Sequence, residues 1–316
     1  MENKEIIVEV PASSGNLGCG FDVLSAALNI KNKFVFCISP GPFSLKIKVS
    51  GFGKESVALS AKNIVWKAAL SVFRKNGFSY KKLGQIKILE ENRIPLMKGL
   101  GSSAAARLAG AFFANEVSGK KLGNLDILKI VASAEGHYDN ASASLFGGIA
   151  ISVPAGKNVA VIPLKNKLKN PICLAVPEID ISTDEARRIL PDKYSKKDVI
   201  FNLSRISSLL AGIHAGKVSP FMFEDMLHTP FRKKLIPGFD EVKKAALGAG
   251  ARGVFISGSG SSVGAVAQDK KNAGKISWAM KKAFAGRGIK SSVILTKIAN
   301  EGIKIKSSRT LSGRVK

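Results

Sequence analysis

Hydrophobic residues along the chain recur with two different periods, one typical of strands and one typical of helices. The two kinds of segment are interspersed and comparable in number. Apolar residues that alternate with polar ones, or that form short runs between turn residues, predict strands, whereas apolar residues recurring every three to four positions predict helices. The predicted strands cover residues 6–10, 34–38, 45–49, 86–90, 145–153, 159–162, 172–176, 254–257 and 291–298. The predicted helices cover residues 64–73, 104–114, 124–134, 183–190, 199–215, 220–227, 241–247 and 273–284. Residues 21–30 fit either pattern.

Residues typical of helix ends support two of these helices. Asn63 is placed to cap the helix at 64–73, and the pair at 76–77, Asn-Gly, closes it. Ser102 or Ser103 is placed to cap the alanine-rich helix that follows. Proline and glycine turns separate the strands, with SPGP between the second and third.

The interspersed strands and helices, together with pairs that resemble hairpins, predict an α+β fold with mixed or antiparallel sheets rather than a doubly wound parallel sheet. A length of 316 residues fits two domains. The best boundary lies within residues 154–158, which divides the chain into domains at 1–156 and 157–316.

Composition narrows the class of protein. Hydrophobic residues make up 45% and charged residues 23%, as in soluble globular proteins. Cys19, Cys37 and Cys173 are odd in number and widely spaced, so neither a disulfide framework nor a zinc site is implied. The first residues lack an apolar signal segment, and no run approaches the roughly 18 apolar residues of a membrane helix. We therefore expect a cytoplasmic protein without a membrane partner.

The charge balance is unusual, since 49 Lys and Arg face 23 Asp and Glu, for a net +26. Such a charge attracts nucleotides, phosphorylated metabolites or nucleic acid. The lysines are spread along the whole chain, which a generally basic surface explains equally well; they are densest after Glu301, at Lys304, Lys306, Arg309, Arg314 and Lys316. A nucleic-acid partner is not favoured, because aromatic residues are only 7% and no stacking motif is present.

The stretch at residues 95–106, PLMKGLGSSAAA, carries the clearest chemical signal. Gly99 and Gly101 allow the backbone to bend and to approach a ligand closely. The serines then open a helix, whose N-terminal N–H groups and dipole favour an anion. The loop is therefore a candidate phosphate site, although a glycine–serine turn before a packed helix has the same pattern. It lacks the lysine of a Walker P-loop and the third glycine of a dinucleotide fingerprint.

Three further stretches have comparable character. Residues 11–22, PASSGNLGCGFD, offer amide and carboxylate groups on a flexible backbone. Residues 135–140, EGHYDN, hold two carboxylates, an imidazole and an amide, and a glutamate beside a phosphate site is a natural Mg²⁺ ligand. Residues 258–262, GSGSS, follow a strand and could form a second backbone cradle.

In this order, the stretches make nearly the whole chain resemble the homoserine kinase family of the GHMP kinase superfamily. The motifs that carry the resemblance are VPASSGNLGCGFD at 10–22, PLMKGLGSSAA at 95–105, EGHYDN at 135–140, STDEAR at 182–187, HTPFR at 228–232 and FISGSG at 255–260. The resemblance implies a two-domain GHMP kinase fold and an ATP-dependent transfer of phosphate to the side-chain hydroxyl of L-homoserine in threonine biosynthesis. It also implies a homodimer.

The resemblance assigns roles residue by residue. For nucleotide binding it implies Asn63, Pro95, Lys98, Gly99, Leu100, Gly101, Ser102, Ser103, Ala104, Ala105, Gly258 and Ser259. Ser102 and Glu135 are implied as Mg²⁺ ligands and, with Asn140, as catalytic residues. The acceptor is implied to lie against Asn16, Asp22, His137, Asp139, Arg187 and Arg232. The two arginines suit its α-carboxylate, because a guanidinium pairs with a carboxylate through two hydrogen bonds.

The pattern places Asn140 where some relatives have an aspartate base, so we predict no side-chain general base of the conventional type. Phosphoryl transfer depends mainly on positioning and charge neutralisation. The alternatives are a GHMP kinase for mevalonate, shikimate or a sugar, a nucleic-acid-binding protein, and a relative that binds a metabolite without turnover.

Overall fold

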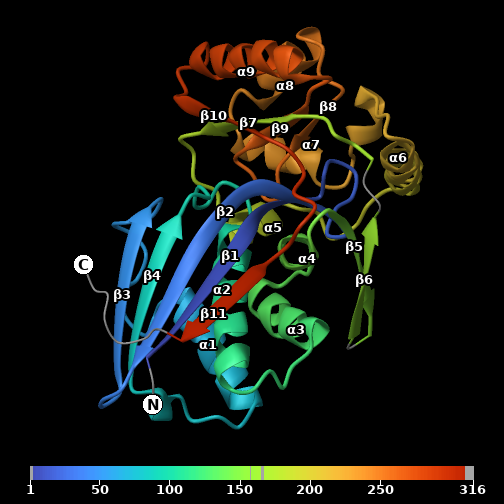
Figure 1. Cartoon of the computed structure of the whole chain (residues 1–316). Helices are drawn as coiled ribbons and strands as arrows, with labels where there is room; N and C mark the ends of the chain where they lie inside the picture. The colour runs from blue at the N-terminus through green and yellow to red at the C-terminus, as the bar shows by residue number, and fades with distance from the viewer. Residues whose placement is uncertain (1–2, 157, 165–166, 310–316) are drawn as a thin grey trace.

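The computed structural model describes residues 3–156, 158–164 and 167–309, and two sheets organise its core (Figure 1). In this part of the chain the first sheet has seven strands in the order β11-β1-β2-β4-β3, with β5 pairing β2 and β6 pairing β5. Their bounds are β1 (Lys4–Gly15), β2 (Leu24–Ser39), β3 (Ser44–Gly51), β4 (Gln85–Asn92), β5 (Ile149–Ala155), β6 (Asn158–Leu164) and β11 (Lys304–Arg309). Only β3 and β4 pair in parallel, so this sheet is mixed.

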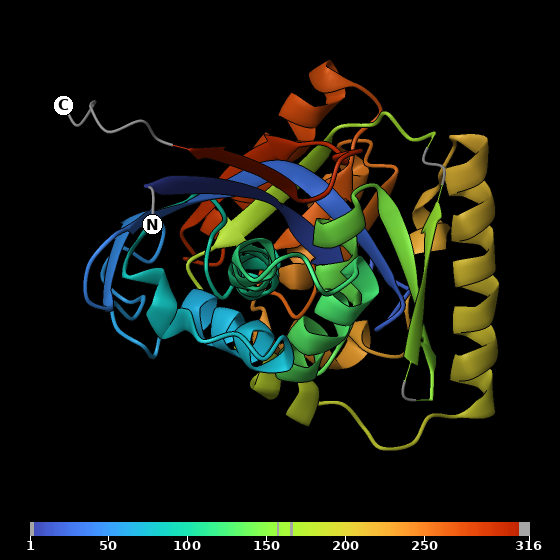
Figure 2. The same cartoon turned by 60° about the horizontal axis from the view of Figure 1, so that its bottom comes forward.

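Four helices cover one face of the first sheet, which Figure 2 shows from a second side. They are α1 (Ile64–Lys75), α2 (Ser102–Val117), α3 (Asn124–Glu135) and α4 (Asp139–Phe146). The central helix is α2, whose alanines allow close packing, and Phe113 stacks on Phe36 of β2 with ring centroids 4.1 Å apart. A Cβ on Gly110 would lie 1.9 Å from the carbonyl oxygen of Val65, so the approach of α1 to α2 requires glycine there.

The second sheet is antiparallel, in the order β10-β7-β9-β8. Its strands are β7 (Ile172–Pro177), β8 (Gly253–Ile256), β9 (Val263–Val266) and β10 (Ser291–Thr296), and α8 (Phe239–Gly248) and α9 (Lys270–Ala285) pack on it. The connection from β7 to β8 contains α5 (Thr183–Arg188), α6 (Lys196–Ala215) and α7 (Thr229–Arg232).

The mixed α+β architecture predicted from the sequence is confirmed, as are most of the helices. Asn63 is the N-cap of α1, and its Oδ1 accepts hydrogen bonds from the N–H groups of Val65 and Trp66. The serine cap of α2 was wrong. Gly101, in the left-handed region at φ 69°, is the N-cap, and no side chain caps the helix.

Several element predictions need correction. The two strands that the SPGP turn connects, β2 and β3, are not neighbours, because β4 lies between them in the sheet. Residues 11–15 extend β1, and residues 24–30 are part of the long strand β2. Residues 220–227 form only a short 3-10 turn, Pro220–Phe223. The short helix α4 and the edge strand β11 were both missed.

The predicted boundary after residue 156 lies in sequence between β5 and β6, and both strands belong to the first sheet. The change of sheet occurs between Leu164 and Ile172, and the chain returns to the first sheet at β11. The division into domains at 1–156 and 157–316 therefore stays a prediction. Arg314 and Lys316 of the basic end lie outside the described residues.

Within the described residues, the structure has no helix long and apolar enough to cross a membrane.

Candidate active site

A cavity of about 430 Å³ opens where α1 and α2 begin. It contains most of the predicted nucleotide residues, namely Asn63, Pro95, Lys98, Gly99, Leu100, Gly101, Ser102, Ser103 and Ser259. Glu135, His137 and Asn140 also line it. The side chains of Ala104 and Ala105 are instead fully buried in the hydrophobic core between α2 and the first sheet. Only their backbone groups can therefore contact a ligand.

Two loops and the end of β1, all far apart in sequence, pack together at the floor of this cavity. A Cβ on Gly99 would lie 2.0 Å from the carbonyl oxygen of Ser257, and one on Gly101 would lie 2.0 Å from Ser13 Oγ. Ser257 Oγ donates a 2.7 Å hydrogen bond to the carbonyl of Gly99, and Ser14 Oγ shares a 2.8 Å hydrogen bond with Ser257 Oγ. The close approach of these segments thus requires glycine at positions 99 and 101. The hydrogen bond from Ser257 fixes the shape of the loop at Gly99.

The cavity meets the uncapped N-terminus of α2. Gly101 accepts the first helical hydrogen bond, from the N–H of Ala105, at 3.0 Å. The N–H groups of a helix's first turn have no intrahelical partner, and here no side chain caps them. Together with the helix dipole, they form a site suited to a phosphate group.

Two predicted nucleotide residues have structural partners of their own. Lys98 Nζ lies 2.8 Å from Asp180 Oδ1 and donates a 2.7 Å hydrogen bond to the carbonyl of Ile179. Asn63 is buried, and its Nδ2 donates to Glu90 Oε1 at 2.8 Å and to the carbonyl of Ala58 at 2.9 Å. Since Asn63 also caps α1, its side chain positions the cavity wall and has no hydrogen atom left for a ligand.

Glu135 is held beside the loop by two contacts. Arg107 Nε lies 2.5 Å from Glu135 Oε1, and Ser103 Oγ donates a 2.7 Å hydrogen bond to Oε2. The hydroxyl that bonds to Glu135 is thus that of Ser103, while Ser102 lines the same cavity and its role as a metal ligand stays a prediction.

The donor set beside the loop consists of one carboxylate, Glu135, and the hydroxyls of Ser102 and Ser103. No group of three His, Cys, Asp or Glu that could hold a metal occurs among the described residues. One carboxylate with adjacent hydroxyls matches the way Mg²⁺ binds through one or two carboxylates, water and the phosphates of a nucleotide. The residues fit a Mg²⁺ ion that arrives with a nucleotide rather than a resident metal.

A narrow second pocket adjoins the cavity and gathers the predicted acceptor residues. It is lined by Asn16, Asp22, His137, Asp139, Asn140, Thr183, Arg187, Arg232, Gly258 and Ser259. His137, Asn140, Thr183 and Ser259 line both pockets, so the two spaces are continuous. All six residues predicted for the acceptor are brought together, from opposite halves of the chain.

Two guanidinium groups dominate this pocket. Arg187 donates two hydrogen bonds to Asp22, each 3.0 Å long. Arg232 is buried, and its Nη1 donates to the carbonyl of Gly258 at 3.0 Å while its Nε donates to the carbonyl of Ala186 at 3.1 Å. These carbonyl contacts fix the direction of Arg232 without neutralising its charge, which suits it to an anionic ligand group.

His137 and Asp139 form a buried pair at the beginning of α4. His137 Nδ1 lies 2.5 Å from Asp139 Oδ1, which also accepts a 2.7 Å hydrogen bond from the N–H of Asn140. Burial opposes charge on both groups, yet the hydrogen bond and charge of the partner dominate, so the pKa of His137 is raised and the pKa of Asp139 is lowered. Both shifts favour the charged forms, an imidazolium beside a carboxylate.

Sequence reasoning missed a second buried histidine behind the acceptor pocket. His228 is fully buried, its Nε2 lies 2.7 Å from the carbonyl oxygen of Gly18, and its ring stacks on Phe21. A carbonyl oxygen only accepts, so Nε2 donates to it, and burial lowers the pKa of His228. Asp225 accepts hydrogen bonds from the N–H groups of His228 and Thr229.

These contacts support the loop at residues 16–22. Asn16, Leu17 and Asp22 have positive φ values of 68°, 45° and 57°, which cost energy in residues other than glycine. The only signal in the sequence was the position of His228 at the start of the HTPFR stretch. Thr183, which lines both pockets, was missed as well.

The chain is similar in sequence and in structure to known small-molecule kinases. Residues 63–148 match the family described as GHMP kinases N terminal domain, and residues 208–286 match GHMP kinases C terminal. The chain is 34% identical over 305 residues to a homoserine kinase of a Picosynechococcus species, covering 95% of this chain and 99% of the relative. It is 36% identical over 306 residues to one from Microchaete diplosiphon, covering 94% and 96%. The crystal structure of homoserine kinase from Cytophaga hutchinsonii matches with a TM-score of 0.84 at 32% identity, covering 96% of this chain and 97% of that one.

Proposed function

The chain belongs to the homoserine kinases of the GHMP kinase superfamily, and we propose that it transfers the γ-phosphoryl group of ATP to the side-chain hydroxyl of L-homoserine. The full-length similarity supports ATP as phosphoryl donor and a role in threonine biosynthesis.

The observation that carries the proposal is the continuity of the two pockets. A phosphate-binding helix N-terminus opens into one space, and two arginines with carboxylates line the other. An amino acid presents a carboxylate and an ammonium group, and the narrow pocket supplies Arg187 and Arg232 for the first and Asp22 for the second. His137 and Asn140 stand at the junction, where the acceptor hydroxyl would meet the γ-phosphate.

The nucleotide would lie with its phosphates on the loop at residues 95–103 and its base toward the start of α1. The uncapped N–H groups of α2 neutralise phosphate charge without any rearrangement, since the packed loops hold them in place. Glu135 and the neighbouring hydroxyls would hold Mg²⁺, which when bound neutralises charge on the phosphates.

The chain's own residues act by positioning rather than by taking a proton. Asn140 Oδ1 accepts a 3.1 Å hydrogen bond from Ser13 Oγ, which leaves the amide Nδ2 as a donor. An amide cannot serve as a general base at neutral pH. Asp139 is engaged by His137 and by the backbone, so its carboxylate orients the imidazolium. We therefore assign Asn140 to orienting the acceptor hydroxyl and the transferred phosphate.

A homodimer is part of this proposal. On α6, Val199, Ile200 and Leu203 are 42%, 55% and 59% exposed, and exposed apolar groups gathered on one helix favour a protein contact. An Ile200→Glu and Leu203→Glu double variant should sediment as a monomer where the parent sediments as a dimer. A parent that is already monomeric at micromolar concentration would exclude this part. We also expect the enzyme to act in the cytoplasm.

The function is tested by coupled measurement of ADP release with L-homoserine, with and without Mg²⁺. We expect turnover that requires both, and little turnover with mevalonate, shikimate or a sugar. Faster turnover of mevalonate than of homoserine would overturn the acceptor assignment. Binding of ATP and homoserine without ADP release would indicate a metabolite-binding relative instead.

A further inference from the structure

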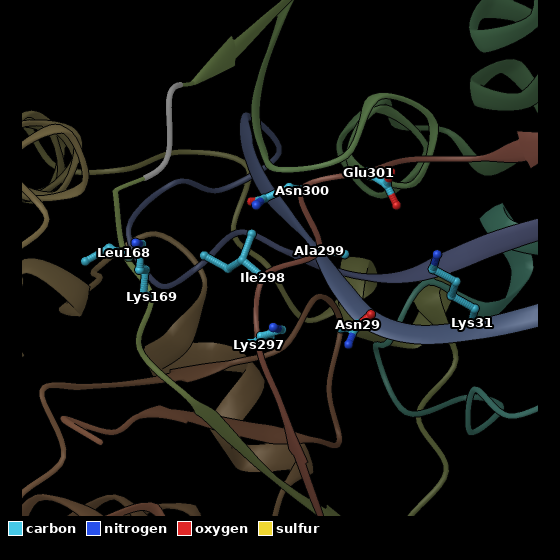
Figure 3. A pocket seen from close by; sticks show the side chains of 9 residues that line it. All are labelled: Asn29, Lys31, Leu168, Lys169, Lys297, Ile298, Ala299, Asn300 and Glu301. Carbon is cyan, nitrogen blue, oxygen red and sulfur yellow. The ribbon is translucent and has the colours of Figure 1, made fainter. Parts of the chain in front are cut away.

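Another hollow, of about 650 Å³, lies where the two sheets meet. It is separate from both pockets of the candidate active site. Figure 3 shows its side chains, which come from three separated segments. Asn29 and Lys31 belong to β2, Lys169 precedes β7, and Lys297 and Asn300 follow β10. The hollow therefore combines strands of the first sheet with both flanks of the second.

Its charge is positive and unbalanced. Among the described residues, no carboxylate lies within ion-pair distance of Lys31, Lys169 or Lys297. The one acidic residue of the lining, Glu301, is paired with Lys304, 2.5 Å away, and its pKa is lowered by Lys304 first and by the charge of Lys31 as well, so one carboxylate serves two lysines. Three ammonium groups line one concave space, and an anion bound in it would be attracted by all three.

The walls of the hollow are fixed in place. The N–H of Asn29 donates to the carbonyl of Lys297 at 2.9 Å, and the N–H of Ala299 donates to the carbonyl of Ala27 at 2.9 Å. Ala299 is buried against Ala27 and Ala143, and the N–H of Gly148 donates to its carbonyl at 2.7 Å. A preformed hollow does not have to be ordered when a ligand binds, which lowers the cost of binding.

The lining also specifies the kind of ligand. Lysines bind phosphate as point charges, and the amides of Asn29 and Asn300 can bond to oxygen atoms. Leu168 and Ile298 supply an apolar side for a carbon skeleton. We propose that this hollow binds a small phosphorylated metabolite with at least two negative charges. It would bind independently of the nucleotide and the acceptor.

The test uses inorganic pyrophosphate as the probe, titrated by calorimetry in metal-free buffer with a non-hydrolysable ATP analogue at saturation. With the nucleotide cavity filled, we expect one remaining saturable site. A Lys31→Gln, Lys169→Gln and Lys297→Gln triple variant should bind pyrophosphate at least about tenfold more weakly, a change of about 1.4 kcal/mol.

A matched control separates a site from the general charge of the chain. Lys270, Lys271 and Lys275 are exposed on α9, outside the hollow, and their replacement by Gln removes the same charge. This control variant should retain the parent's affinity. Pyrophosphate should also raise the melting temperature of the parent and of the control, and not of the hollow variant.

Equal weakening in the two triple variants would show that only net charge attracts the anion and would overturn the proposal. The absence of a saturable site in the parent would overturn it as well. Neither measurement depends on turnover, so failure here is distinguishable from failure of the proposed kinase activity.

Discussion

Arg187 and Asp22 face each other through two parallel hydrogen bonds of 3.0 Å, joining residues 165 positions apart at the mouth of the acceptor pocket. Each side chain is about one-third exposed, at 34% and 36%, so a ligand can reach the pair. An amino acid carries a carboxylate, which can pair with Arg187, and an ammonium group, which can pair with Asp22. It can therefore insert between the two side chains and leave neither of them unpaired.

Removing either partner should therefore weaken the acceptor and leave the nucleotide unchanged. Hydrogen bonds to charged groups contribute about 1.5–3 kcal/mol, so we expect the KM for homoserine to rise about ten- to a hundredfold in Arg187→Ala and in Asp22→Asn. Because the residues are in contact, the double variant should lose less than the sum. Arg188→Ala, an exposed neighbour on the same helix, is the control. A matching rise in the KM for ATP would contradict this assignment.

The His137–Asp139 pair predicts a pH dependence of stability. The pKa of His137 is raised in the folded state, so its contribution is fully present below the unfolded value of 6.5 and is lost as pH rises through the folded pKa. The pKa of Asp139 is lowered, so its contribution is present above 3.8 and is lost as pH falls through the folded pKa.

Chemical unfolding of the parent and of His137→Asn across this range provides the measurement. The parent should exceed the variant in free energy of unfolding at pH 6, and the gap should narrow as pH rises above 6.5. His228 is present in both proteins, so its titration cancels in the comparison. A gap that widens with pH would show that His137 is neutral in the folded protein.

Replacement of Gly99 should separate the packed loops. A Cβ there would overlap the carbonyl of Ser257, and φ is +67°, so we expect Gly99→Ala to cost about 2–3 kcal/mol of stability and to raise the KM for ATP. Gly119 provides a matched control, because its φ is +92° but nothing lies within 4 Å of its Cβ position. Equal losses in both variants would attribute the effect to backbone conformation rather than to the close approach.

His228 should act on the acceptor through the loop that it supports. His228→Leu leaves the carbonyl of Gly18 without its donor, and we expect a rise in the KM for homoserine together with a loss of about 1–3 kcal/mol of stability. His228→Gln keeps an N–H donor and should recover much of the homoserine affinity. If His228→Leu lowered stability without changing the KM for homoserine, the residue would serve the fold alone.

The absence of a side-chain base can be tested at Asp139. Asp139→Asn removes the charge that pairs with His137, so homoserine affinity and turnover should fall together. Steady-state kinetics with independently measured affinities for both substrates separate the two effects. Turnover abolished with both affinities intact would identify Asp139 as a general base, and the same result at Asp22 would do so for that residue.

Sequence reasoning succeeded where local chemistry decides the structure. Asn63 caps α1 because its side chain competes well for free N–H groups, and this can be foreseen from the residue and its position. The six acceptor residues could be grouped only because their motifs resemble a family. Nothing in the spacing of Asp22 and Arg187 indicates that they meet.

What remained hidden depends on long-range packing. The hydrogen bond from Ser103 to Glu135 could not be foreseen, because which side chain of a helix's first turn faces a neighbouring element cannot be resolved without the backbone. Similarly, β4 enters the sheet between β2 and β3 because sheet order is set by the whole core and not by the turn that joins two strands. The position of His228 in the HTPFR stretch did not reveal its role, because its partner, the carbonyl of Gly18, is a backbone group.

The pairing of β11 with β1 affects how the protein can be made. Lys4 to Glu9 find their outer neighbours only at residues 304–309, so during synthesis on the ribosome one edge of β1 stays open until almost all of the described chain has emerged. An open strand edge invites pairing with other chains. Nascent chains of this protein are therefore exposed to misassociation for most of their elongation, and their dependence on chaperones should end when β11 is added.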